Sequence, residues 1–174
     1  MRLAEGYRIL LSEEALRDRV KEIGARIARD YAGRSPVLVG VLKGSFVFMA
    51  DLVRAIDLPL EVDFIGITSY EGTESTGVVR ITQDLSRPVE GKDVLLVEDI
   101  VDTGLSMRYL LDNLATRHPA SVKVCALLEK PSRARVTVPI DYRGFEIEDV
   151  FVVGYGLDHS GTGRNLPFVG VPVR

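Results

Sequence analysis

Residues 93–106, DVLLVEDIVDTGLS, constrain the fold more than any other part of the sequence. The continuous apolar run at 94–97 is typical of a parallel strand that is covered on both faces. Two adjacent carboxylates, Glu98 and Asp99, follow this run, and a turn rich in hydroxyl and glycine residues leads into a helical pattern from Met107. Open α/β sheets bind ligands at the carboxyl ends of their strands, and N–H groups at a helix start attract anions. The segment therefore predicts a sugar-phosphate site.

The remainder of the chain alternates between helical and strand-like patterns. Apolar residues at spacings of three and four predict an amphipathic helix over 13–32, with Ser12 as its N-cap and Gly33 at its end. Strands that alternate with helices indicate an α/β fold with a mainly parallel sheet flanked by helices on both faces. The other expected elements are a strand at 36–42, a helix at 46–56, strands at 60–68, 77–82 and 122–128, and a β-rich tail that contains FVVGYGLD at 151–158.

Length and charge narrow the class of protein. A chain of 174 residues has the usual size of one domain, so we expect a single domain over 1–174. The net charge of −3 argues against nonspecific binding of nucleic acid, and no apolar run approaches the ~20 residues that span a bilayer. The single cysteine, Cys125, excludes an intramolecular disulfide, and its apolar surroundings predict a buried strand residue. We expect a cytoplasmic protein.

The motif at 93–106 resembles the binding signature for 5-phospho-α-D-ribose 1-diphosphate (PRPP) of type I phosphoribosyltransferases. Its EDIVDTG core looks most like that of the hypoxanthine-guanine phosphoribosyltransferases, and four further segments match from about Tyr7 to the end. The resemblance implies the type I phosphoribosyltransferase fold, in which the terminal segments form a small hood over the carboxyl edge of the sheet. It also implies purine salvage, with Mg²⁺-dependent transfer of the 5-phosphoribosyl group from PRPP to hypoxanthine or guanine, which gives IMP or GMP and pyrophosphate.

The resemblance assigns roles to the carboxylates of this motif. Glu98 and Asp99 would orient the ribose hydroxyls and hold Mg²⁺, directly or through water, because Mg²⁺ prefers oxygen ligands. Asp102 would be the general base that receives the proton from purine N7. The alternative for Asp102 is a cap on the following helix.

The stretch after Asp102 would bind the 5′-phosphate. Leu105 departs from family members that carry lysine at this position, and a cradle of backbone N–H groups tolerates the change. The residues expected in this cradle, besides Asp102, are Thr103, Gly104, Leu105 and Ser106.

Three other places in the sequence resemble the parts of family members that bind pyrophosphate or close over the site. Lys43 and Gly44 match the pyrophosphate loop, in which the peptide before the lysine is cis, and Arg164 matches the arginine that grips pyrophosphate. A solvated loop residue is the alternative for Lys43. Ser69 and Tyr70 match the Ser-Tyr pair of the flexible lid that keeps water from the reacting centre, and a plain surface hairpin tip is the alternative.

The purine pocket is expected near the C-terminus. Lys130, after the strand LLE, matches the lysine that donates a hydrogen bond to the purine 6-oxo group, although a strand-end lysine without function is nearly as common. Phe151 would stack on the base, Val152 would read its edge through the backbone, and Asp158 resembles a second metal-associated carboxylate. The departures His159 and Gly163, where relatives more often have aromatic residues, bear on the shape of this pocket.

Two other readings of the same fold remain open. One is a regulator that binds nucleotide as a signal, and its discriminating feature, a basic face or an added nucleic-acid module, is not evident in the sequence. The other keeps the enzyme but changes the base to xanthine or a pyrimidine. Family members are dimers or tetramers, so the resemblance also implies a homodimer or homotetramer.

Overall fold

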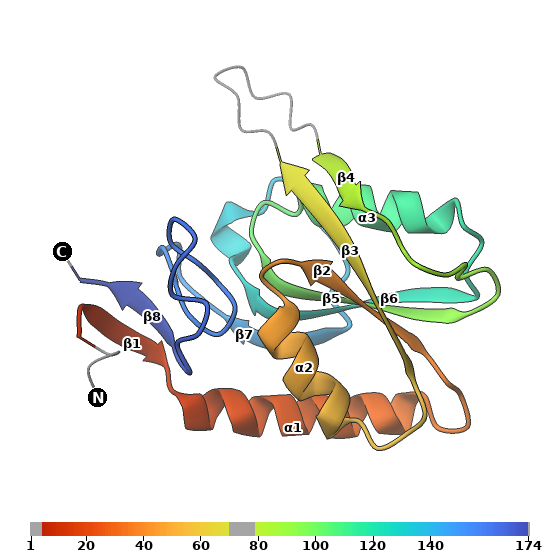
Figure 1. The fold of residues 1–174 in the computed structure, drawn as a ribbon, viewed down its shortest axis with the longest axis horizontal. Coiled ribbons are helices and arrows are strands. Elements are labelled where there is room, and N and C mark those ends of the chain that lie inside the picture. The colour runs from red at the N-terminus through yellow and green to blue at the C-terminus, as the bar shows by residue number, and fades with distance from the viewer. Residues whose placement is uncertain (1–4, 70–78, 174) are drawn as a thin grey trace.

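The computed structural model describes residues 5–69 and 79–173 and is built on a six-stranded sheet (Figure 1). The strand order is β4-β3-β2-β5-β6-β7, and every neighbouring pair is parallel except β3 and β4. The predicted mainly parallel sheet is therefore confirmed. The strands are β2 (Val37–Leu42), β3 (Glu61–Ser69), β4 (Val79–Gln83), β5 (Asp93–Val101), β6 (Ser121–Glu129) and β7 (Tyr142–Glu146).

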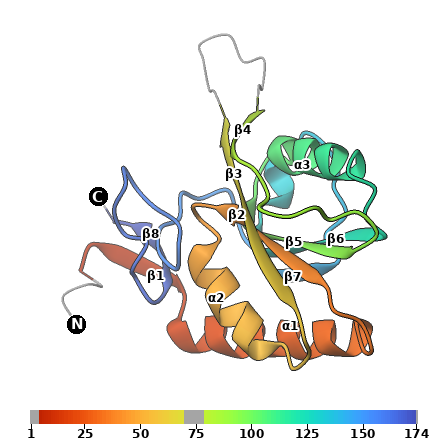
Figure 2. The ribbon, with the colours of Figure 1, turned by 45° about the vertical axis from the view of Figure 1, so that its right-hand side comes forward.

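Helices cover both faces of this sheet (Figure 2). The helices are α1 (Glu13–Asp30), α2 (Phe46–Ala55) and α3 (Leu105–Ala115), and a 3₁₀ turn, η2 (Pro131–Arg133), follows β6. One core lies between the sheet and the α1–α2 pair, and the other lies between the sheet and α3. Within the described residues, no helix is long and apolar enough to cross a membrane.

Strand β5 supplies side chains to both cores. Leu95 and Val97 belong to the core under α1 and α2, whereas Val94 and Leu96 belong to the core under α3. Successive side chains of a strand point to opposite faces, so a strand that is buried on both faces reads as a continuous apolar run. Cys125 on β6 is 0% exposed, as predicted.

Helix α1 begins as predicted and ends slightly earlier. The Ala15 N–H donates to the Ser12 hydroxyl oxygen over 3.2 Å, which makes Ser12 the N-cap. The helix ends at Asp30, and Gly33, with a φ of +75°, lies in the turn that follows. Gly24 is where α1 meets α2, because a Cβ on Gly24 would lie 2.5 Å from the Ala55 carbonyl oxygen.

A second, smaller sheet joins the two terminal segments beside the main sheet (Figure 1). Strands β1 (Tyr7–Leu11) and β8 (Val169–Pro172) pair antiparallel, and Val153 bridges to Gly170 on β8. These elements form the expected hood. The tail after β6 is β-rich as expected, with β7, β8 and isolated bridges, and within it the segment 151–158 forms bridges and turns without a regular strand.

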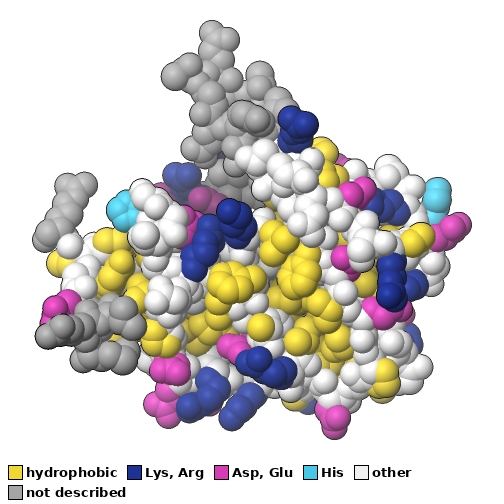
Figure 3. Space-filling view, viewed as in Figure 1, with side chains coloured by type: hydrophobic (Ala, Val, Ile, Leu, Met, Phe, Trp, Pro, Cys, Tyr) yellow, Lys and Arg dark blue, Asp and Glu magenta, His cyan; other side chains and the backbone are white. Residues whose placement is uncertain are grey.

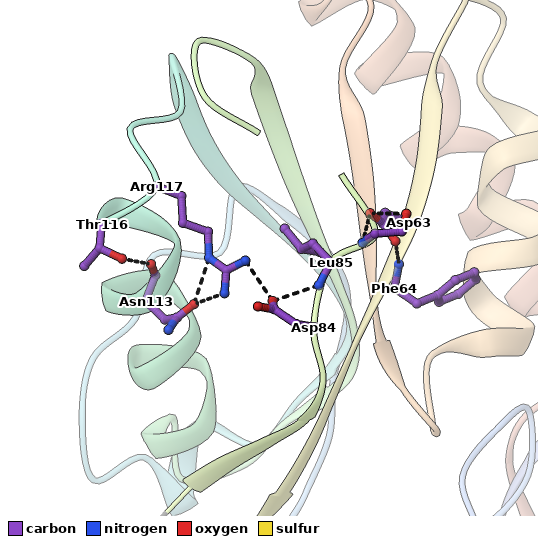
Figure 4. A network of polar contacts seen from close by, with 8 residues as sticks. Asp63, Phe64, Asp84, Leu85, Asn113, Thr116 and Arg117 are labelled. Atoms are coloured by element: carbon purple, nitrogen blue, oxygen red, sulfur yellow. Dashed lines mark hydrogen bonds and ion pairs between the residues drawn. The ribbon is translucent and has the colours of Figure 1, made fainter. Parts of the chain in front are cut away.

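An ion-paired network fixes the connection between β4 and β5 (Figure 4). Arg117, just beyond α3, pairs with Asp84 over 2.7 Å and also donates to the Asn113 side-chain oxygen. This contact with Arg117 lowers the pKa of Asp84 below its usual value. The Asp63 carboxylate on β3 accepts hydrogen bonds from the backbone and hydroxyl of Ser86 at 2.9 and 3.0 Å. The connection is thereby tied to both α3 and β3.

The close crossing of α1 and α2 gives a stability prediction. Alanine is more favourable than glycine inside a helix by about 1 kcal/mol, but forcing a methyl group against the Ala55 carbonyl costs about 1–3 kcal/mol. We expect Gly24→Ala to lower the free energy of unfolding in urea by up to about 2 kcal/mol. Lys21→Ala, an exposed change on the same helix, should stay within about 0.5 kcal/mol of the unaltered protein. A Gly24→Ala variant more stable than the unaltered protein would contradict the prediction, because it would show that α1 and α2 can move apart to admit the methyl group without loss of stability.

Candidate active site

The candidate site lies where the direction of strand addition reverses. From β2 the chain adds β3 on one side, and β5 is placed on the other side of β2. In open α/β sheets, ligands bind at such a switch point, beyond the carboxyl ends of the strands. Here Gly44, after β2, meets Asp99 on β5 so closely that a Cβ on Gly44 would lie 1.6 Å from an Asp99 carboxylate oxygen. Only glycine fits this position.

A cavity of about 300 Å³ opens beside this contact. It brings together residues from five separate segments, including the loops after β2, β5 and β6. The lining consists of Gly44, Asp99, Ile100, Asp102, Lys130, Phe151, Val152, Leu157, Asp158 and Arg164. One cavity therefore contains the predicted general base, Asp102, and most of the residues predicted to bind the purine and the pyrophosphate.

Glu98 and Asp99 form a pair of adjacent carboxylates, of which Glu98 is buried and Asp99 is half-buried in the cavity wall. The Asp99 N–H donates to Glu98 Oε1 over 3.1 Å, and the Ile100 N–H donates to Asp99 Oδ1 over 2.8 Å. Burial raises the pKa of Glu98 well above its usual value, and the neighbouring Asp99 charge adds to the effect. Burial also raises the pKa of Asp99, against the opposing charge of Arg164. A cation beside this pair would favour the ionised forms of both carboxyl groups.

A second, smaller cavity adjoins Glu98 at the start of α3. Its volume is about 50 Å³, and Gly104, with a φ of +82°, begins the helix beside it. A glycine suits this position because the left-handed backbone disfavours side chains and a Cβ would lie 2.5 Å from the Val136 carbonyl oxygen. Of the predicted phosphate cradle, Thr103, Gly104 and Ser106 line this cavity, whereas Leu105 does not.

Asp102 lines both cavities. Its Oδ1 accepts a hydrogen bond of 2.9 Å from Nε of Arg133, in the 3₁₀ turn after β6. Helix α3 has Gly104 at its N-cap and no side-chain capping bond, so the capping alternative for Asp102 is not what the structure shows. Backbone bonds from Lys130 N to the Val101 oxygen hold the two loops together.

Lys130 is buried in the cavity wall. Its side chain is 9% exposed, and its Nζ lies 3.7 Å from Oδ1 of Asp149. The other oxygen of Asp149, Oδ2, lies 3.7 Å from NH1 of Arg133. Asp102, Arg133, Asp149 and Lys130 are thus connected in series along one side of the cavity.

Asp158 and Arg164 form a second charged pair in the same cavity. Arg164 NH2 lies 2.6 Å from Asp158 Oδ1, and Arg164 NH1 donates to the Gly156 carbonyl oxygen over 2.6 Å. Gly156 itself lies against the loop after β2, because a Cβ on it would lie 2.1 Å from the Gly44 carbonyl oxygen. The loop that carries Gly156 and Arg164, which we call the hood loop, therefore contacts the loop after β2 through its backbone.

The aromatic wall of the cavity is accessible. Phe151 is 55% exposed, and its ring meets the His159 ring edge-on at a centroid distance of 5.3 Å. Val152 is buried and also lines the cavity. Gly163, the second departure from the family pattern, has a φ of +90°, and a Cβ there would lie 2.4 Å from Val153. The local backbone is therefore matched to glycine.

Lys43 and the predicted lid residues are not among the described residues that line the larger cavity. The Leu42–Lys43 peptide bond is cis, as predicted, and the Lys43 side chain is exposed outside the cavity lining. Ser69 is the last residue of β3, and its side chain is not described. Tyr70 lies outside the described residues, so the predicted lid stays a prediction.

Sequence reasoning missed several residues of the site. Arg133 and Asp149 carry no motif, and both are charged residues of the kind that usually face solvent. Ile100 and Leu157 lie within the recognised motifs but were not predicted as site residues, and both line the cavity. The one available signal was the position of Arg133 three residues after Lys130, in a turn begun by proline.

Comparison with known proteins agrees with this geometry. Residues 6–160 match the model of the phosphoribosyl transferase domain family. The chain is 46% identical over 165 residues to the hypoxanthine-guanine phosphoribosyltransferase of Bacillus subtilis, covering 94% of this chain and 92% of that protein.

The chain belongs to the hypoxanthine-guanine phosphoribosyltransferase family.

Further members show the same extent of similarity. The hypoxanthine-guanine phosphoribosyltransferase of Streptococcus pneumoniae is 47% identical over 165 residues, with 94% of this chain and 92% of that protein covered. The crystal structure of a hypoxanthine phosphoribosyltransferase from Staphylococcus aureus superposes with a TM-score of 0.94 at 42% identity, and the match covers 99% of this chain and 95% of that one. The predicted family and fold class are confirmed.

The contact between Gly44 and Asp99 gives a prediction about both activity and stability. Gly44→Ala should lower phosphoribosyltransferase activity by at least about 100-fold, because displacing a site by about 1 Å has this effect, and overpacking should cost about 1–3 kcal/mol of stability. The double variant Gly44→Ala, Asp99→Ala should recover the stability, measured by urea unfolding, but not the activity. Full activity in Gly44→Ala would contradict the close approach.

The buried carboxylate pair gives a prediction about pH. Because burial raises the Glu98 pKa, the native protein binds the proton more tightly than the unfolded chain. The stabilisation that this tighter proton binding gives the folded protein is fully present below about pH 4.3, the pKa of glutamate in an unfolded chain. It is lost as the pH rises through the pKa of Glu98 in the native protein. In EDTA, we therefore expect Glu98→Gln to gain stability relative to the unaltered protein as the pH rises from about 5 to about 8. Urea unfolding across this range measures the difference, and a constant difference would refute the explanation.

Proposed function

We propose that the protein transfers the 5-phosphoribosyl group of PRPP to hypoxanthine or guanine, producing IMP or GMP and pyrophosphate. The observation that carries the proposal is that Asp102 and Lys130 line one cavity with Asp99. A carboxylate can accept the proton of purine N7, and a lysine ammonium can only donate, which matches a 6-oxo group. The relatives from Bacillus subtilis and Streptococcus pneumoniae, named for the same two bases, support it.

The reaction would use these groups as follows. A bond forms between purine N9 and the ribose C1′ while the bond from C1′ to pyrophosphate breaks, and Asp102 takes the N7 proton. Positive charge develops at C1′, so a site that excludes water protects this centre from hydrolysis. Phe151 is exposed to the cavity and can stack on the purine ring, and the Val152 backbone lies beside it.

The phosphates would be held at two places. The small cavity at the start of α3, lined by Thr103, Gly104 and Ser106, suits the 5′-phosphate because a helix N-terminus and hydroxyl groups favour an anion. Arg164 in the larger cavity can bind pyrophosphate with its planar fork of donors. The exposed Lys43 would add its charge from the loop after β2.

Phosphoribosyltransferases of this family work with a divalent cation, and we propose Mg²⁺. No group of three histidine, cysteine or acidic residues suited to a metal occurs in the part of the chain that the structure describes. Mg²⁺ retains several waters and binds proteins through only one or two carboxylates together with substrate phosphates. Asp99 and Asp158 on the same cavity, with Glu98 behind Asp99, fit this requirement. The bound ion would neutralise charge on the departing pyrophosphate.

The test is an assay of the purified protein with Mg²⁺, PRPP and, separately, hypoxanthine, guanine, xanthine, adenine and uracil. Nucleotide formation with hypoxanthine and guanine, and at least about 100-fold less with adenine, is the expected result, because adenine places a donor opposite Lys130. Folded protein that binds PRPP and turns over none of the bases would reject the proposal in favour of a nucleotide-binding regulator.

The role of Asp102 gives a sharper prediction. Asp102→Asn should lower the turnover number with hypoxanthine by about 10²–10⁴-fold, the usual contribution of a general base. The thermal midpoint should remain close to that of the unaltered protein, since Asp102 is partly exposed. Asp112→Asn, an exposed aspartate on α3, is the control and should leave turnover unchanged. Unchanged turnover in Asp102→Asn would assign the proton transfer to another group.

We also propose one cytoplasmic phosphoribosyltransferase domain over 1–174 that assembles into a homodimer or homotetramer. Figure 3 shows hydrophobic side chains gathered over α2 and β3, and Phe46 on α2 and Val62 on β3 are 44% and 47% exposed. Burial of such an apolar face favours association. Size-exclusion chromatography with light scattering should give at least twice the chain mass of 19.2 kDa. A mass of one chain at micromolar concentration would reject the assembly.

A further inference from the structure

Asp149 lies between two cationic residues of the proposed site without lining the cavity itself. It belongs to the segment between β7 and the hood, and its side chain is 50% exposed. Each of its oxygens faces a different cation, with Oδ1 3.7 Å from Lys130 Nζ and Oδ2 3.7 Å from Arg133 NH1. One carboxylate therefore bridges two loops that both contribute to the site.

The contact with Lys130 has a physical requirement behind it. Lys130 is buried and lines the cavity, and a buried ammonium group is costly unless an opposite charge lies near it. Asp149 supplies that charge from the side facing solvent. The flexible four-carbon stem of lysine allows many positions for its ammonium group, so a fixed carboxylate also limits where Nζ can lie.

Arg133 extends the same arrangement to Asp102, the proposed general base. Its Nε donates to Asp102 Oδ1 over 2.9 Å, while its NH1 faces Asp149. The planar guanidinium holds its donors in a fixed geometry, so it can orient two carboxylates at once. Asp102 and Lys130 are consequently the two ends of one chain of alternating charges.

In the proposed function, Asp102 and Lys130 contact neighbouring atoms of the purine. N7 and the 6-oxo oxygen lie side by side on one edge of the ring, and the proposed function places Asp102 at the first and Lys130 at the second. We infer that Asp149 is a positioning residue that acts through Lys130 to set the preference for 6-oxo purines, and that Arg133 links it to Asp102. The inference rests on the proposed function, because it gives the two ends of the chain their purine contacts.

The primary test is Asp149→Asn, which removes the charge and keeps the shape. The KM for hypoxanthine should rise about three- to tenfold, as expected for the loss of a partly exposed partner of a charged group, with the KM for PRPP unchanged. The inhibition constant of unsubstituted purine, which has no 6-oxo group, should stay the same. A general disturbance of the pocket would weaken both purines equally and would overturn the inference.

Two further variants separate the charge at this position from folding effects. Glu148→Gln removes the charge of the adjacent exposed carboxylate and should leave every constant unchanged. Asp149→Glu retains the charge and should recover at least part of the affinity for hypoxanthine. If Glu148→Gln had the same effect as Asp149→Asn, the effect would come from the change in net charge, and the inference about Asp149 would be overturned.

A double-mutant cycle tests whether Asp149 acts through Lys130. If it does, Asp149→Asn should have no further effect on hypoxanthine affinity once Lys130→Ala is present. For the other link, Arg133→Gln should lower turnover in the unaltered protein but not in Asp102→Asn, whereas Arg135→Gln, an exposed change in the same loop, should not alter turnover. Additive effects in the Asp149 and Lys130 cycle would overturn the inference. Turnover by the unaltered protein tests the proposed function separately.

Discussion

The arrangement of the site depends on two adjacent carboxyl groups near the carboxyl end of β5. Glu98 is buried and Asp99 is half-buried, in a strand whose apolar residues are covered on both faces, so both carboxyl groups lie in a setting that disfavours charge. This setting has a binding consequence. In the proposed function, a cation and the phosphates that accompany it would offset the electrostatic free energy that folding alone leaves unfavourable.

Much of this site could be predicted because its chemistry is contained in short contiguous segments. The apolar run at 94–97 correctly predicted a buried strand, and the carboxylates and the turn after it predicted an anion site beside the cavities that the structure shows. The parallel sheet explains why this local inference extends further. Once β2, β5 and β6 are parallel neighbours, the residues that follow them must meet at one edge, which brings Gly44, Asp102 and Lys130 together.

The remainder depends on contacts between segments, which periodicity does not encode. The segment at 151–158 has the composition of a strand, but glycines at positive φ turn it back over the sheet, and its aromatic residue Phe151 becomes exposed. Arg133 and Asp149 look like ordinary surface charges in the sequence. Their relation appears only when η2 and the segment after β7 are placed side by side, and the side chain of Lys130 becomes buried for the same reason.

The contact of Gly156 with Gly44 has a mechanical consequence. No side chain separates the hood loop from the loop after β2, and a Cβ on Gly156 would lie 2.1 Å from the Gly44 carbonyl oxygen. A side chain at position 156 would therefore force the two backbones apart and displace Gly44, which packs against Asp99.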